Sequence, residues 1–193
     1  MKNIFIAITA AAISFAACNS NNSASKDTSD KNNDSSSQAK MQTATDKKTT
    51  VSVNEIVSGY LQLKEALTND NGKGAADAGK AIVETVSRID KSAFTPEQKK
   101  VYDNIESDIK ENAEHIGANA DKIAHQREHF EMLSNDMYDL VKAFKTDQPL
   151  YKDFCPMAND GKGAFWISET KEIKNPYRGK KMPTCGSVKE EIK

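Results

Sequence analysis

The sequence has little of what usually marks a nucleic-acid-binding protein or a common enzyme. Its 27 Lys and Arg residues against 28 Asp and Glu residues leave a formal net charge of -1. There is thus no basic field to hold a phosphate backbone, and we expect no nucleic-acid partner. The chain contains neither a Gly-rich phosphate loop nor a Gly-x-Ser-x-Gly motif. Since these motifs are missing, we expect no catalytic activity. The length of 193 residues allows one modest domain and excludes a multi-domain enzyme.

The first residues have the pattern of an export signal. Lys2 precedes an apolar stretch over residues 4–15 that is too short to span a bilayer and that closes in small residues. We therefore expect residues 1–17 to be a signal peptide and the protein to leave the cytoplasm. The sequence Phe-Ala-Ala-Cys ending at Cys18 resembles a bacterial lipobox. This resemblance implies that Cys18 carries acyl chains, which would anchor the protein to the cell envelope, facing the periplasm. The alternative is an ordinary signal that is cleaved nearby.

Residues 18–50 are expected to be the lipidated cysteine followed by a disordered tether. From Asn19 to Thr50 there is no aromatic and no branched aliphatic side chain. Such a segment cannot bury enough apolar surface to offset the entropy of ordering, so it would hold the folded part away from the membrane.

Residues 51–145 carry the periodicity of four amphipathic helices. Ser52 with Glu55, and Thr95 with Gln98, have the spacing of capping boxes that begin helices. In the fourth helix, from about Asn119 to Lys145, apolar residues recur at intervals of seven. Short connections between narrow apolar stripes predict an all-α fold, an up-down-up-down four-helix bundle.

Residues 146–193 differ in composition, because four of the five prolines lie there. We expect an irregular Pro/Gly-rich segment packed on the bundle, with a short strand at 164–167 that could form part of a β-hairpin. Trp166 is interpreted as a packing residue rather than as part of a ligand box.

Two short segments of this region carry a nearly mirror-image set of sulfur atoms: Cys155, Met157, Met182 and Cys185. Thiols and thioethers together select soft ions such as Cu(I). The alternative is a disulfide between Cys155 and Cys185, the default state of paired thiols in an exported protein. A disulfide across this loop would stabilise the fold by about 3.7 kcal/mol. On spacing alone, the disulfide is the favoured alternative.

A second set of donors lies on the fourth helix. His125, His129 and Met132 occupy positions i, i+4 and i+7, so they share one stripe at the edge of the apolar face. Two histidines four residues apart can share a metal ion, but this stripe lacks a third certain donor. A solvated or hydrogen-bonded role is the alternative, and His115 is given less weight still.

Several motifs of the chain resemble the domain-of-unknown-function 3347 family: Gln126-Arg127-Glu128-His129-Phe130, Cys155-Pro156-Met157-Ala158, Gly163-Ala164-Phe165-Trp166, Asn175-Pro176-Tyr177 and Met182 to Gly186. The resemblance covers about residues 51–193. The family occurs in envelope lipoproteins of Bacteroidetes-type bacteria and at the ends of periplasmic adaptor subunits of heavy-metal efflux pumps. The resemblance implies an association with copper and silver efflux, which is not a mechanism.

These patterns lead to one hypothesis and one alternative. The hypothesis is an envelope lipoprotein that binds Cu(I) or Ag(I) through Cys155, Met157, Met182 and Cys185, with His129 and His125 as accessory donors. It would sequester the ion or hand it to a heavy-metal efflux adaptor protein. The alternative is a non-catalytic protein-interaction module whose tail is clamped by a disulfide.

Overall fold

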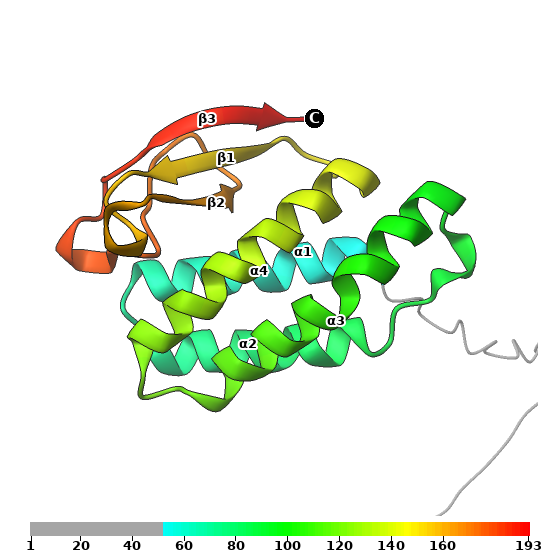
Figure 1. The fold of residues 1–193 in the computed structure, drawn as a ribbon, viewed down its shortest axis with the longest axis horizontal. Helices are drawn as coiled ribbons and strands as arrows, with labels where there is room; N and C mark the ends of the chain where they lie inside the picture. The colour runs from blue at the N-terminus through cyan, green and yellow to red at the C-terminus, as the bar shows by residue number, and fades with distance from the viewer. Residues whose placement is uncertain (1–51) are drawn as a thin grey trace, which may run out of the picture. The chain divides into compact units, whose positions relative to one another are not determined.

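In a computed structural model of the chain, the structure describes residues 52–193. The predicted signal peptide, the predicted lipidation site Cys18 and the predicted tether lie outside the described residues. Four helices come first along the chain (Figure 1): α1 (Val53–Thr68), α2 (Gly72–Val86), α3 (Pro96–Ala118) and α4 (Ile123–Phe144). Within residues 52–193, no helix is both long and apolar enough to cross a bilayer.

Local signals in the sequence account for where the helices begin. The Glu55 carboxylate accepts a hydrogen bond from the Ser52 amide at 3.3 Å. At the start of α3, Thr95 and Gln98 bond reciprocally between side chain and backbone, at 3.0 and 3.2 Å. These contacts satisfy amides that the first helical turn leaves without partners. The prediction of four packed helices is confirmed.

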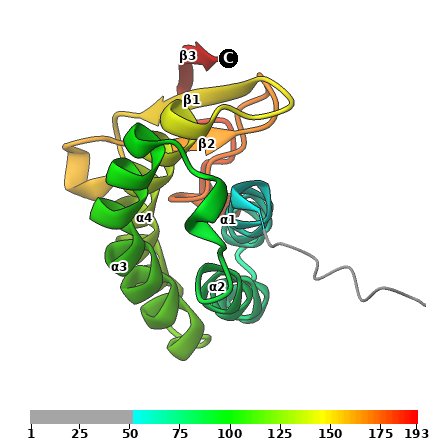
Figure 2. The ribbon, with the colours of Figure 1, turned by 90° about the vertical axis from the view of Figure 1, so that its right-hand side faces the viewer.

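Successive helices pack against each other, and α4 also contacts α1, which closes the bundle (Figure 2). Each helix contributes to a shared apolar core that also includes strand residues. The fully buried aromatic residues of the helices are Tyr60, Tyr102 and Phe130. Tyr60 stacks on Phe130 with ring centroids 5.1 Å apart, so α1 and α4 meet through aromatic rings at the centre of the core.

The segment after α4 forms a three-stranded antiparallel sheet, so the all-α prediction was wrong for this part of the chain. Strand order is β2-β1-β3, with β1 at Leu150–Cys155, β2 at Ala164–Ser168 and β3 at Ser187–Ile192. Only β2 coincides with a predicted strand. β3 is an edge strand in which four of six residues are exposed and three are charged, so it has no alternating apolar pattern to detect.

The sheet is joined to the bundle by a buried chain of hydrogen bonds. The amide of Ile167 on β2 donates to the Tyr60 hydroxyl at 3.1 Å. The Ser134 hydroxyl donates to the Phe130 carbonyl at 2.7 Å, so Tyr60 donates in turn to Ser134, also at 2.7 Å. This chain connects β2, α1 and α4. Trp166, the neighbour of Ile167, is fully buried in the core, as the packing interpretation requires.

Candidate functional site

The two cysteines of the C-terminal region lie side by side. Cys155 ends β1 and Cys185 lies just before β3, and their Sγ atoms are 2.9 Å apart. Both are free thiols. Cys155 is fully buried, whereas Cys185 is partly exposed, so the pair can be reached from the surface through Cys185.

Asn175 positions the loop that carries Cys185. Its side-chain Nδ2 donates to the Cys185 carbonyl at 2.6 Å, and its own amide donates to the Pro183 carbonyl at 2.8 Å. Its Oδ1 accepts from the amides of Tyr177 and Arg178, both at 2.9 Å. Asn175 is fully buried, so these contacts are shielded from water. The Asn-Pro-Tyr motif is thus the turn that holds the second cysteine beside β1.

The surroundings favour a negative charge on Cys155. Burial alone would raise the pKa of this thiol. Hydrogen bonds from the Cys185 thiol, the Met157 amide, the Asn175 side chain and the Ala158 amide outweigh burial and bring the pKa below its ordinary value. The hydrogen bond to Cys155, together with burial, raises the pKa of Cys185. Cys155 is therefore the more acidic thiol of the pair, and Cys185 donates to it.

The two thioethers lie in the turns that adjoin the cysteines. Met157 follows Cys155 by two residues and is 45% exposed. Met182 is half-buried and begins the turn in which the Cys185 amide donates to the Met182 carbonyl at 3.3 Å. The structure thus brings the two thiols together at the end of the sheet and places one thioether-bearing residue in each flanking turn.

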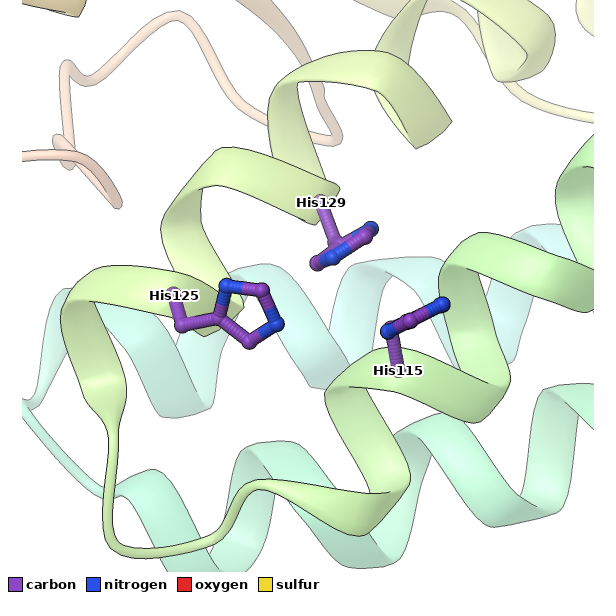
Figure 3. Close-up of side chains that lie close together, drawn as sticks. All are labelled: His115, His125 and His129. Carbon is purple, nitrogen blue, oxygen red and sulfur yellow. The ribbon is translucent and has the colours of Figure 1, made fainter.

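The three histidines form a separate cluster between α3 and α4. Each of His115, His125 and His129 offers a ring nitrogen within 4.8 Å of the others, and neither Cys155 nor Cys185 belongs to this group. The rings of His115 and His129 stack with centroids 4.2 Å apart, and the His125 ring stands across that of His129 at 4.5 Å (Figure 3). His125 and His129 are therefore grouped with His115, and not with the sulfur atoms.

Hydrogen bonds from the surrounding residues orient two of the three rings. His129 Nδ1 lies 3.0 Å from Asn112 Oδ1, and His125 Nδ1 lies 3.1 Å from Glu128 Oε2. Burial, and then the neighbouring rings of His115 and His125, lower the pKa of His129. Met132, from the same predicted stripe, is 45% exposed on α4 and is not needed to complete a set of three nitrogen donors.

His115 belongs to the cluster although its own helix gave little sign of a ligand role, and one signal in the sequence could have identified it. α3 ends at Ala118 and α4 begins at Ile123, so a tight turn joins them. In two antiparallel helices joined by a short turn, residues at similar distances from the turn face each other. Counting outward from the turn places His115 opposite the first turns of α4, where His125 and His129 lie.

Comparisons with known proteins give a match to one family model but to no individual protein. No curated protein and no solved structure matches the chain. A family model described as "Protein of unknown function (DUF3347)" matches residues 56–149, which cover almost all of the four helices and end just before β1. The resemblance to the DUF3347 family is confirmed for residues 56–149, which include the Gln126 to Phe130 motif, whereas the motifs after residue 149 lie outside the match.

Proposed function

We propose that the protein binds a soft metal ion, Cu(I) or Ag(I), through Cys155 and Cys185, and sequesters it or passes it to a heavy-metal efflux system in the cell envelope. The observation that carries this proposal is the pair of free thiols whose sulfur atoms lie 2.9 Å apart, and hydrogen bonds lower the pKa of one of them, Cys155. Thiolates bind soft ions in preference to Mg²⁺ or Ca²⁺. Met157 and Met182 supply thioethers from the two flanking turns.

Exchange among these donors suits transfer. A thioether is a weaker ligand than a thiolate, so an ion held by two cysteines and a methionine leaves more readily than one held by a closed thiolate cage. The exposed Met157 would meet an incoming acceptor first. Attachment to the envelope rests on the lipobox-like sequence at Cys18, and the efflux partner rests on the resemblance described above.

Cu(I) titration of the reduced, anaerobic full-length protein, in competition with a chromophoric chelator, tests the site. We expect one equivalent to bind and Cys155→Ser with Cys185→Ser to abolish binding. Met157→Leu is expected to weaken binding, whereas Met132→Leu leaves it unchanged. These two methionines make a matched pair, since both are 45% exposed. Absence of binding, or binding that survives the double Ser substitution, contradicts the proposal.

The same pair of thiols favours a second function, a non-catalytic interaction module with a disulfide-clamped tail. An exported protein with two adjacent thiols forms a disulfide by default. Mass analysis of native periplasmic material, alkylated before reduction, separates the two functions. Material that is two hydrogens lighter and cannot be alkylated at Cys155 supports the clamp, whereas free thiols support the metal site.

A further inference from the structure

All three histidines of the chain lie in one cluster. They come from two helices: His115 lies in the last turns of α3, and His125 and His129 lie in the first two turns of α4. Figure 3 shows the three rings facing one another across the space between these helices. This convergence brings the three imidazole rings into contact with one another.

The hydrogen bond to His129 fixes which of its nitrogens can bind an ion. The Asn112 amide nitrogen donates to the Asp108 carbonyl at 2.9 Å, so the Asn112 oxygen faces His129. That oxygen can only accept, which means that His129 Nδ1 carries the proton and Nε2 keeps its lone pair. Asn112 is only 7% exposed and therefore holds the ring firmly.

His125 is oriented in the same way by a carboxylate. Glu128 accepts from His125 Nδ1 at 3.1 Å, which leaves Nε2 of His125 as the free donor atom. A metal-bound histidine almost always gives its other ring nitrogen to a carboxylate or a carbonyl group, which sets the tautomer and makes the ligand more basic. Two of the three histidines already have such a partner.

The cluster also has the size that a metal site needs. Nitrogens bound to one Zn²⁺ at about 2.0–2.1 Å in a tetrahedron are ~3.4 Å apart. One ring nitrogen of each histidine lies within 4.8 Å of those of the other two. Binding of one ion requires the exposed His115 ring to turn out of its parallel stack on His129, so that the lone pairs converge. Since His115 is exposed, water or a partner's side chain can take the fourth position.

From this geometry we infer that His115, His125 and His129 form a second metal site, one for a divalent ion of the Zn²⁺ or Cu²⁺ kind. Imidazole suits these borderline ions, whereas Mg²⁺ and Ca²⁺ prefer oxygen ligands and Cu(I) prefers sulfur. The site shares no ligand with the cysteine pair, so the chain offers one site to soft ions and another to borderline ions. A negative result at either site leaves the proposal for the other unaffected.

Zn²⁺ titration of the full-length protein, followed by calorimetry in a buffer that does not bind metal, tests the second site. The titrated protein carries Cys155→Ser and Cys185→Ser, because cysteine thiolates also bind Zn²⁺, and we expect it to bind one equivalent. His115→Ala or His129→Ala is expected to weaken binding by more than about 100-fold, because each removes a direct ligand, while Mg²⁺ does not compete. Glu114→Gln is the matched control, since Glu114 is an exposed neighbour of His115 that lies outside the cluster.

A second measurement identifies the ligands directly. Cu²⁺ bound to the double Ser protein is expected to show electron paramagnetic resonance splitting from three nitrogens, and from fewer in His115→Ala. Asn112→Ala keeps all three ligands but removes the positioning contact, so we expect about 10–100-fold weaker binding with the same three-nitrogen signature. Zn²⁺ binding that is absent, that is unchanged in His115→Ala, or that is lost with the cysteines would overturn the inference.

Discussion

Asp153 lies in the core without a hydrogen-bond partner for either carboxylate oxygen among the described residues. Nearby, the fully buried Lys64 makes an ion pair with Glu169 at 2.7 Å. Burial raises the pKa of Asp153 to about 7, and Glu169 adds to this rise while Lys64 opposes it. With Asp153 protonated, the Lys64–Glu169 pair is balanced in charge, whereas ionised Asp153 would add an uncompensated negative charge to the core.

This arrangement predicts that Asp153 makes the fold less stable as pH rises. Since the pKa is higher in the folded state, that state binds the proton more tightly, and the advantage is lost as pH increases from about 4 through 7. Between pH 5 and 8 we expect a loss of roughly 2–3 kcal/mol. Asp153→Asn removes this loss. Urea unfolding should therefore show that the free energy of unfolding of the variant, relative to the wild type, rises by the same amount between pH 5 and 8. A difference between the two proteins that stays constant with pH would contradict the assignment.

The α2–α3 contact depends on a glycine. A Cβ on Gly79 would lie 2.7 Å from the Ala113 carbonyl oxygen and 3.0 Å from the Gly117 amide nitrogen. Both obstacles are backbone atoms of α3, which cannot move away independently of their helix. The absence of a side chain at position 79 therefore sets how closely the two helices approach.

We expect Gly79→Ala to destabilise the protein by about 1–3 kcal/mol, as overpacked substitutions do. This would occur although alanine is intrinsically the better helix former by about 1 kcal/mol. Chemical unfolding measures the effect, and Glu84→Ala on the exposed side of α2 is the control expected to change stability little. A more stable Gly79→Ala protein would mean that α2 and α3 can separate freely.

What the sequence could predict differs between elements for physical reasons. The helices were predictable because capping signals such as Thr95 with Gln98 and an apolar period act over a few residues. The sheet was not, because β3 pairs with β1 across a long loop and is mostly polar. Cysteine spacing showed a pair but not its geometry, which depends on the Asn175 turn. The histidine cluster required the pairing of α3 with α4, which a single-helix stripe does not contain.

At the scale of the whole molecule, Arg127 joins three distant parts of the chain. From α4, its Nε donates to the Pro176 carbonyl at 2.7 Å, and its Nη2 donates to the Leu67 carbonyl at 2.9 Å and to Asp70 at 2.6 Å. Asp70 also accepts from the Lys180 amide at 3.1 Å. One guanidinium thus binds the end of α1, the turn after it and the loop before the cysteine turn.

Arg127→Ala is expected to lower the free energy of unfolding by about 2–4 kcal/mol, because several hydrogen bonds to a charged group are lost together. Arg127→Lys keeps the positive charge but loses the planar set of guanidinium N–H donors, so we expect a smaller decrease in the free energy of unfolding than for Arg127→Ala. Urea unfolding followed by Trp166 fluorescence measures both variants. If Arg127→Ala unfolds at the wild-type urea concentration, the C-terminal segment is held by its apolar contacts alone.

The hydrogen bond from the Ile167 amide to the Tyr60 hydroxyl is expected to slow hydrogen exchange on β2, an edge strand, to the rate of a central strand. Amides on the unpaired edge of a sheet ordinarily exchange with deuterated water through local fraying, which is fast. Here that proton can leave only when β2 separates from α1, so its exchange reports opening of the whole unit. In Tyr60→Phe the Ile167 amide would exchange orders of magnitude sooner, while amides in α2 keep nearly their former protection.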